Sequence, residues 1–209
     1  LDSFMRQDAA SGFVVPVDQL VQETATELYT LVPDDPTLVE AETRRRVRFA
    51  ARTDLYDHIR LVDGRLPANE PVDGVYEVLV VERSLSELNM VLGNIFRVEA
   101  EGVTRDIKVK PVGVIDKLDH ADPYWYAHMA EYSSTFLLDS ELFESEFMDA
   151  RVLPPSNANW LFVLDYTEMD LAGVHAYVET NERINEHLFA RFNTFEVGAP
   201  ALQTIEGYF

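Results

Sequence analysis

The apolar residues near the start of the chain recur at the spacing of a helix. Asp18 is placed to cap such a helix, and the apolar positions that follow lie three or four residues apart. These positions are Leu20, Val21, Ala25, Leu28 and Leu31. The break Pro33-Asp34-Asp35-Pro36 ends the predicted helix, and a second helix is expected from about Thr37 to Arg52.

The second predicted helix carries five of the 17 basic residues of the chain, namely Arg44, Arg45, Arg46, Arg48 and Arg52. One interpretation is a docking surface for an acidic partner or for lipid headgroups. The other is a solvated helix face whose arginines pair with Glu40 and Glu42, four residues before Arg44 and Arg46. The second is favoured, because charge runs on helices are usually surface.

From Gly64 onward the pattern becomes extended. The run from Val75 to Val81 predicts a strand buried on both faces. Ser84 to Glu87 fits a capping box that opens a short helix, with Gly93 placed to end it. The inward-facing residues of this helix are expected to be Leu85, Leu88 and Val91.

Two further strands complete this unit. Ile95 to Glu99 alternates as a strand, Glu101-Gly102 is turn-like, and Ile107 to Ile115 predicts another strand. Because Pro111 has no N–H to donate, its strand is expected to lie at a sheet edge or to contain a bulge. The stretch from Gly64 to Asp116 is therefore predicted to form a compact β-α-β-β unit.

The remaining third of the chain mixes short strands with helices. Thr135 to Leu138 predicts a strand that leads into a helix capped by Asp139 or Ser140. A loop is expected at Pro154 to Asn157 and a strand at Trp160 to Tyr166. The longest helical pattern runs from about Glu168 to Phe192.

The composition of the chain makes some kinds of function unfavourable. The chain has 17 basic and 37 acidic residues, and its net charge of −20 makes nucleic-acid binding unfavourable. Cysteine is absent, which excludes disulfides and thiolate chemistry. No apolar run approaches the roughly 20 residues that span a bilayer. The chain opens Leu1-Asp2-Ser3 without an initiating Met or a leader, so we expect a piece of a longer protein.

Motifs for catalysis are missing from the sequence. It contains no Gly-rich phosphate loop, no Gly-x-Ser-x-Gly elbow and no His-Glu-x-x-His. One group has the residue types of a divalent metal site, but its spacing is not diagnostic and we expect surface groups instead: Asp119, His120, Asp122, His128 and Glu131. We therefore assign no catalytic, cofactor-binding or metal-binding residue, and expect no enzyme activity in this chain. The separate histidines His58, His175 and His187 are expected to be ordinary polar positions.

The aromatic run Tyr124-Trp125-Tyr126 follows Pro123 directly. Three adjacent large rings cannot all face one core, so part of the run is expected to cover a lobe boundary or to meet a partner. A lid packed over the β-rich unit is the favoured interpretation, and a partner or ligand surface is the alternative.

Several short motifs occur in a characteristic order. They are Asp63-Gly64-Arg65-Leu66-Pro67, Glu77 to Val80, Leu92-Gly93-Asn94 and Val112 to Ile115. This order resembles the extracytoplasmic domain of bacterial ABC-transporter permeases of the FtsX-like and MacB-like type. The likeness covers roughly Asp54 to Phe209, although Asn94 stands where many members have Asp and the N-terminal third has no match.

The resemblance implies an α+β fold like the MacB periplasmic core domain, with two lobes in a single extracytoplasmic domain. A mixed-sheet lobe would be formed from both ends of the chain, about 1–60 plus 155–209, and a β-rich lobe of about 61–154 would be inserted into it. Gly64, Arg65, Pro67, Gly93 and Gly113 are the structural family residues, with Arg65 as a local tether. Tyr124, Trp125 and Tyr126 are the candidate partner surface.

The resemblance also implies a function and a location. The domain would lie on the extracytoplasmic side of a bacterial cell membrane and would contact substrate or transmit conformational change. A cytoplasmic ATP-binding subunit would be reached through membrane helices outside this chain, and the parent protein is expected to be dimeric. An extracytoplasmic protein, peptide or lipid is the expected substrate or partner.

Two alternatives remain open from the sequence. A free-standing secreted binding protein would need a signal peptide upstream and no membrane span downstream. A metal-dependent hydrolase would use His120, Asp122 and His128 and would contain bound metal.

Overall fold

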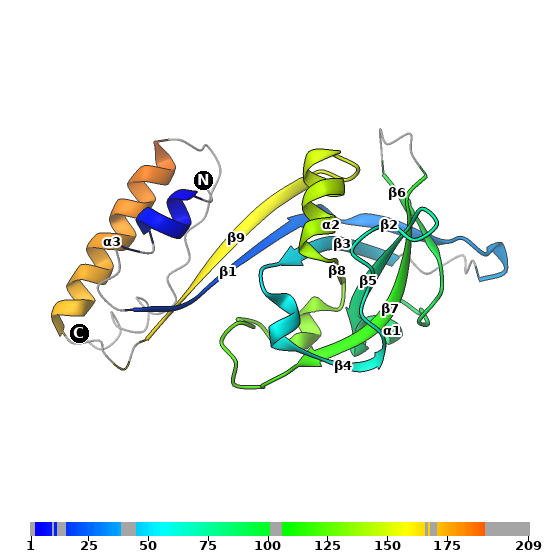
Figure 1. Cartoon of the computed structure of the whole chain (residues 1–209), viewed down its shortest axis with the longest axis horizontal. Helices are drawn as coiled ribbons and strands as arrows, with labels where there is room; N and C mark the ends of the chain where they lie inside the picture. Colours follow the sequence, from blue (N-terminus) through cyan, green and yellow to red (C-terminus); the bar gives the residue numbers. More distant parts are fainter. Residues whose placement is uncertain are drawn as a thin grey trace. The chain divides into compact units, whose positions relative to one another are not determined.

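The computed structural model describes residues 3–9, 11, 16–38, 45–100, 106–165, 167 and 171–190 (Figure 1). The chain divides into two compact units. Unit 1 combines Leu1–Leu20 with Leu161–Phe209, and unit 2 is the continuous segment Val21–Trp160. The predicted turn at Glu101-Gly102 lies outside the described residues.

The described strands form one mixed nine-stranded sheet. They are β1 (Val17–Thr26), β2 (Tyr29–Pro33), β3 (Arg45–Arg52), β4 (Ile59–Gly64), β5 (Val75–Val81), β6 (Phe96–Glu99), β7 (Lys108–Lys117), β8 (Thr135–Leu137) and β9 (Pro155–Leu164). The helices are α1 (Glu82–Glu87), α2 (Ser140–Leu142) and α3 (Leu171–Phe189), supplemented by short 3₁₀ and π turns. The α+β class expected from the sequence is confirmed.

Six of these strands close into a barrel within unit 2. Their order is β2-β6-β7-β5-β8-β3, and β3 pairs again with β2. The β5–β7 and β3–β8 pairs are parallel, whereas the other pairs of the ring are antiparallel. Closure leaves these six strands without a free sheet edge and encloses the hydrophobic core. Strand β4 extends the sheet from β7, and β1 continues it from β3 to β9.

The core is built from inward-facing aromatic and β-branched side chains. Phe49 of β3 packs edge-on against Phe136 of β8, with ring centroids 5.9 Å apart. Phe143 and Phe147 belong to the π-helical turn η6 (Phe143–Asp149), which continues from α2, and their rings stack at 5.1 Å. Phe147 also meets the ring of Tyr76 at 5.5 Å. One helical segment therefore supplies aromatic rings to the core of the barrel.

The helix predicted from Asp18 is wrong, because this segment forms β1 and β2. Both strands pair antiparallel with β3, and the register moves by one residue between them, which places a bulge at Glu27-Leu28. Residues 23–26 are all buried. A strand buried on both sides has no polar alternation, so its apolar positions also match helical spacing.

The second predicted helix, Thr37 to Arg52, is also wrong in its C-terminal half. Residues 45–52 are strand β3, whose first five residues alternate between inward and outward positions. Arg45 and Arg52 are buried and Arg46 is exposed, so neither a helical docking face nor a solvated helix face exists there. Arg44, Glu40 and Glu42 lie outside the described residues.

The remaining predicted elements correspond closely to the structure. Strands β5, β6, β7 and β8 and helix α3 occur where they were predicted, and Asp139 caps α2 by accepting from the backbone N–H groups of Glu141 and Leu142. The bulge alternative for Pro111 is confirmed, since the β5–β7 register shifts just after Pro111 while β7 lies inside the barrel.

Three boundaries near these elements differ from the prediction. Helix α1 begins at Glu82, so Ser84 is a buried interior residue and not its cap. Val91 is 67% exposed and does not face inward, because the helix has already ended at Glu87. Strand β9 begins at Pro155, within the predicted loop, because backbone pairing with β1 extends it.

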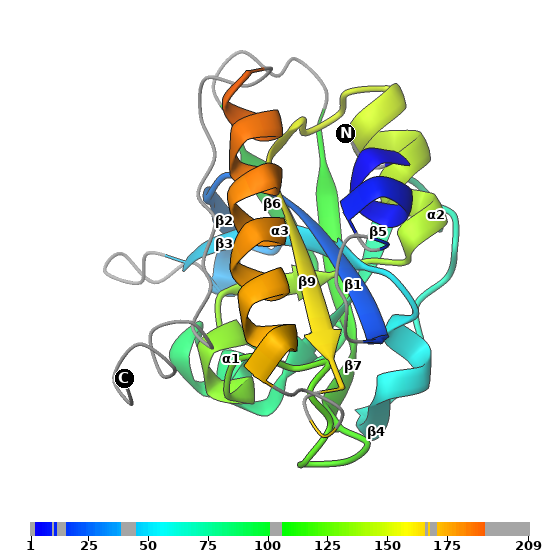
Figure 2. The same ribbon diagram turned by 90° about the vertical axis from the view of Figure 1, so that its left-hand side faces the viewer.

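Unit 1 brings together segments from both ends of the chain. The π-helical turn η1 (Phe4–Ala9) and the helix α3 belong to this unit (Figure 2). The ring of Phe4 stacks on that of His187 in α3 at 3.7 Å with an interplanar angle of 2°. Ile184 and Leu188 of α3 are buried, as are Met5 and Ala9 of η1. None of the described helices combines the length and apolar character needed to cross a bilayer.

The barrel core makes a direct prediction for the substitution Phe147→Ala. This ring is fully buried among other aromatic rings, so its removal should lower the free energy of unfolding by about 3–5 kcal/mol. The matched control is Met148→Ala at the exposed neighbouring position, which should change it by less than about 0.5 kcal/mol. Urea unfolding followed by circular dichroism measures both, and equal effects would contradict this packing.

Candidate functional site

Two glycines of the short sequence motifs, Gly64 and Gly113, meet where β4 ends beside β7. Gly64 is paired with Gly113, and the N–H of Arg65 donates to the carbonyl oxygen of Val112 at 2.9 Å. A Cβ on Gly64 would overlap that oxygen, and a Cβ on Gly113 would overlap the carbonyl oxygen of Arg65. Gly64 also has a φ of +78°, which favours glycine. The close approach of the two backbones therefore depends on glycine at both positions.

Arg65 holds this turn to the barrel through a buried carboxylate. Its two terminal nitrogens donate to the two oxygens of Glu77, with Nη1 to Oε2 at 2.6 Å. Glu77 lies in the middle of β5, is 1% exposed, and also accepts from the N–H of Ala68 at 3.1 Å. Lys110 Nζ lies 3.4 Å from its Oε1. The hydrogen bonds from Arg65 lower the pKa of Glu77, against the effect of burial, so the carboxylate stays ionised.

Gly93 and Pro67 belong to the same neighbourhood. The N–H of Gly93 donates to the carbonyl oxygen of Pro111 at 2.8 Å, directly at the β7 bulge. Pro67 is half-buried between Arg65 and Ala68, the two residues whose groups bind Glu77. We call Gly64, Arg65, Gly93, Gly113 and Glu77 the motif cluster. Glu77 was not singled out from the sequence, although a lone carboxylate in the apolar run Val75 to Val81 is a usable signal.

A second cluster surrounds Arg52 at the end of β3. The segment Leu118–Tyr132, here called the aromatic loop, places four rings around the guanidinium. The distances from the Arg52 Cζ atom to the ring centroids are 4.6 Å for Tyr124, 4.8 Å for Trp125, 5.5 Å for Tyr126 and 5.6 Å for Tyr132. Cation–π attraction is strongest in such a desolvated setting. Tyr124 and Trp125 are buried, whereas Tyr126 is 54% exposed.

Hydrogen bonds join Arg52 to the loop and to β1. Nη1 donates to Glu23 Oε2 and to the hydroxyl of Tyr132, both at 2.9 Å, and Nη2 donates to the carbonyl oxygen of Tyr124 at 2.7 Å. Burial raises the pKa of Tyr124 to about 12 and also raises the pKa of Tyr132, so both phenols are neutral at physiological pH. Glu23 is therefore the countercharge of Arg52.

His58 joins the start of the aromatic loop to its middle. Its ring stacks on Tyr124 at 3.8 Å, and its Nδ1 lies 2.6 Å from Asp122 Oδ2. Its carbonyl oxygen accepts from the N–H of Leu118 at 3.1 Å and from the indole Nε1 of Trp125 at 3.0 Å. The first half of the aromatic loop is thus held together by one residue, as in a compact surface loop.

The residues considered for a metal site serve separate local roles. Asp119 accepts from the N–H of Ala121, and Asp122 binds His58. His128 and Glu131 form a capping box at the 3₁₀ turn η5 (Met129–Tyr132). His120 is exposed. Within the part of the chain that the structure describes, no three histidine or carboxylate side chains converge on one point.

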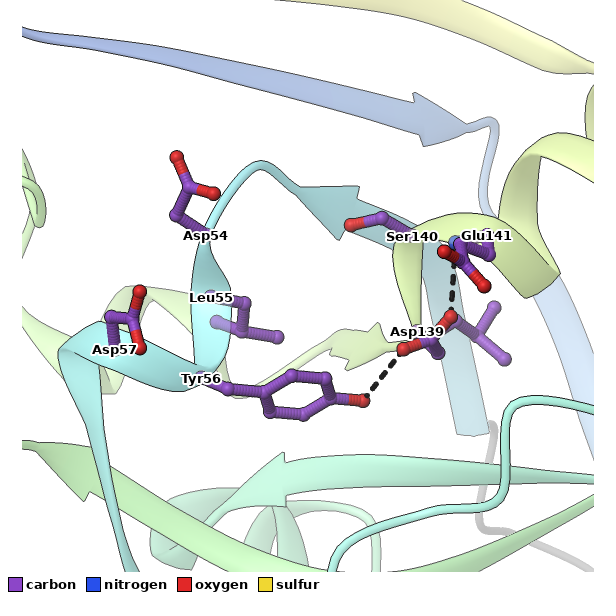
Figure 3. Close-up of a pocket in the computed structure, with 8 residues that line it drawn as sticks. Asp54, Leu55, Tyr56, Asp57, Asp139, Ser140 and Glu141 are labelled. Atoms are coloured by element: carbon purple, nitrogen blue, oxygen red, sulfur yellow. Dashed lines mark hydrogen bonds between the residues drawn. The ribbon is translucent and has the colours of Figure 1, made fainter.

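A cavity of about 300 Å³ is formed next to the end of β3, and Figure 3 shows the residues that line it. It is lined by residues from the turn after β3 and from the start of α2: Asp54, Leu55, Tyr56, Asp57, Leu138, Asp139, Ser140 and Glu141. The hydroxyl of Tyr56 donates to Asp139 Oδ2 at 3.1 Å across it (Figure 3). Ser140 Oγ donates to the carbonyl oxygen of Arg52 at 3.0 Å. Two segments about 80 residues apart form this cavity, and no sequence signal indicated it.

Comparisons with known proteins give few matches. No family model matches the chain, and no curated protein matches it. Among solved structures, a domain of a permease protein from Porphyromonas gingivalis is similar, with 14% sequence identity and a TM-score of 0.42. The alignment covers 87% of this chain and 74% of that chain. At this identity and TM-score, no functional statement about this chain follows from the likeness.

Alanine substitutions at two glycines of the motif cluster should lower the free energy of unfolding by different amounts. Gly64→Ala combines positive φ with overlap onto the Val112 carbonyl, so it should lower the free energy of unfolding by at least about 3 kcal/mol. Gly93→Ala has positive φ but open space around the new methyl, so it should cost only about 1–2 kcal/mol. Chemical unfolding of both variants tests this, and a Gly93 variant as unstable as the Gly64 variant would contradict it.

The difference in stability between the unmodified chain and Glu77→Gln should depend on pH. Its pKa is lowered in the folded protein, so its ionised form stabilises the fold above the unfolded-state pKa of about 4. This stabilisation is lost as pH falls through the lower folded pKa. Glu77→Gln should therefore lower the free energy of unfolding by about 1–3 kcal/mol at pH 7, and by progressively less below about pH 4. Unfolding curves across this pH range test it, with the exposed Glu70→Gln as control, and a cost independent of pH would contradict it.

Proposed function

We propose that this chain is the extracytoplasmic domain of a bacterial ABC-transporter permease of the FtsX-like or MacB-like type. The observation that carries the proposal is the motif cluster. Residues recognised from the order of short sequence motifs come together around the β7 bulge, where Gly64 and Gly113 permit close backbone approach and the N–H of Gly93 donates to the Pro111 carbonyl oxygen. A chance match of weak motifs would give no reason for them to meet in space.

The division of the chain also supports this proposal. Residues near both ends belong to unit 1, and the chain enters and leaves unit 2 through β1 and β9. A domain placed between two membrane spans needs both of its ends in the part that faces the membrane. Unit 1 combines segments from near both ends of the chain, and unit 2 is the segment inserted between them, which fits this requirement.

The proposed role is recognition and mechanical transmission without chemistry in this domain. Of the residues considered for a hydrolase, Asp122 binds His58, His128 belongs to a capping box and His120 is exposed, an arrangement that gives no support to a hydrolase. ATP would be hydrolysed by a cytoplasmic subunit that acts through membrane helices of a dimeric parent protein. A peptide, lipid or protein outside the cell would meet exposed groups such as Tyr126 and the acidic cavity.

Cysteine accessibility in intact cells tests the location. The chain contains no cysteine, so Val91→Cys introduces a single exposed thiol into it. In the parent protein, with any other cysteines replaced, this thiol should react with a membrane-impermeant maleimide before the cells are opened. The buried Leu79→Cys serves as matched control and should react only after denaturation.

The outcome separates the three hypotheses. Labelling of Val91→Cys in whole cells, with the protein in the membrane fraction, supports the permease domain. Recovery of the protein in the medium or in a soluble extracytoplasmic fraction would indicate a secreted binding protein. Labelling only after the cells are broken would place the domain in the cytoplasm and overturn the proposal.

A further inference from the structure

The buried pair between Arg52 and Glu23 is only partly hydrogen-bonded. One Nη1–Oε2 bond joins the two side chains. Arg52 Nε and Glu23 Oε1 are both buried and have no hydrogen-bond partner among the described residues. A buried donor and a buried acceptor on the same ion pair thus remain unused, which costs free energy in the observed arrangement.

A different arrangement of the same two side chains would use both atoms. A guanidinium can offer Nε–H and a terminal N–H side by side to the two oxygens of one carboxylate. In the observed structure, Nη2 binds the carbonyl oxygen of Tyr124, and Nη1 is shared between Glu23 and the hydroxyl of Tyr132. Arg52 therefore uses two of its donors to hold the aromatic loop instead of forming this fork with Glu23.

We infer that the Arg52 side chain switches between two positions, and that one of them holds the aromatic loop closed. In the closed position it holds the Tyr124 carbonyl and the Tyr132 hydroxyl. In the open position it forms a two-bond fork with Glu23, and the loop groups that it releases bind water. The charge pair persists in both positions, so the loop opens without leaving a buried guanidinium uncompensated.

The location of Tyr126 gives an external partner access to this switch. Its ring is more than half exposed and lies 5.5 Å from the Arg52 Cζ atom. A partner that binds this ring and moves it away from Arg52 removes one of the four cation–π contacts of the guanidinium. The loss of this contact favours the open position. This inference does not depend on the proposed permease function, because it rests on the contacts of Arg52 alone.

Hydrogen exchange of two side-chain protons tests the switch by NMR in the full chain. The Trp125 indole N–H donates to the His58 carbonyl, so its exchange reports opening of the loop. The Arg52 Nε–H reports whether the fork forms. Trp160→Phe assigns the indole signal, and Arg52→Lys assigns the Nε signal by its loss. The backbone N–H of Val78 in β5 reports global unfolding.

The test variant is Tyr132→Phe, which removes one hydrogen bond of the closed position only. Exchange of the Trp125 indole proton should rise roughly fivefold. Exchange of Arg52 Nε–H should not rise with it, because the fork protects this proton whenever the loop is open. Tyr76→Phe is the matched control: it removes a tyrosine hydrogen bond to Glu146 and should leave the ratio of the two exchange rates unchanged.

Two results would overturn the inference. In the first, both protons exchange faster by the same factor in Tyr132→Phe, which means that opening exposes Arg52 to water. In the second, the indole proton exchanges only at the rate of Val78, which means that the loop does not open locally. Should Tyr132→Phe fail to fold, urea below the unfolding transition is applied to the unmodified chain, and the same two protons are compared.

Discussion

A guanidinium that is 1% exposed must find its countercharge and its hydrogen-bond acceptors inside the protein, and Arg52 finds them on several separate segments. Glu23 of β1 supplies the charge, the aromatic loop supplies a carbonyl and four rings, and Ser140 of α2 binds the Arg52 backbone. The desolvation of an arginine costs several kcal/mol unless these partners are present. Consequently β1, β3, the aromatic loop and α2 have to be in place together.

The motif cluster meets a different constraint at β7. There the limiting factor is space, because Gly64 and Gly113 let the turn after β4 lie directly on the β7 backbone. Glu77 then provides a buried charge that Arg65 can reach from the exposed side. The two terminal nitrogens of Arg65, the N–H of Ala68 and the Nζ of Lys110 all face this one carboxylate, so the turn after β4 is tied to β5 and β7.

Local signals predicted much of the fold correctly. The bulge at Pro111 follows from a missing N–H, the cap of α2 from the carboxylate of Asp139, and β5 from an apolar run bounded by turns. Strand β1 was missed because burial of residues 23–26 on both sides removes the alternation that distinguishes a strand from a helix. For β3 the alternation was present, but the arginines were interpreted as solvent-exposed. Arg45 and Arg52 instead donate to buried carbonyl oxygens, at Leu88 and Tyr124 respectively.

The sequence by itself determined the elements whose causes are local: the punctuated strands from Val75 to Lys117, the long helix α3 and the need for glycine in the motif turns. Only the tertiary structure decided which charges are buried, that the six strands close into a barrel, and that the aromatic loop surrounds Arg52. The physical reason is sequence separation. Glu23, Arg52 and Tyr132 lie up to 109 residues apart, and the favourable energy of their contacts arises only when the fold has excluded water from all of them.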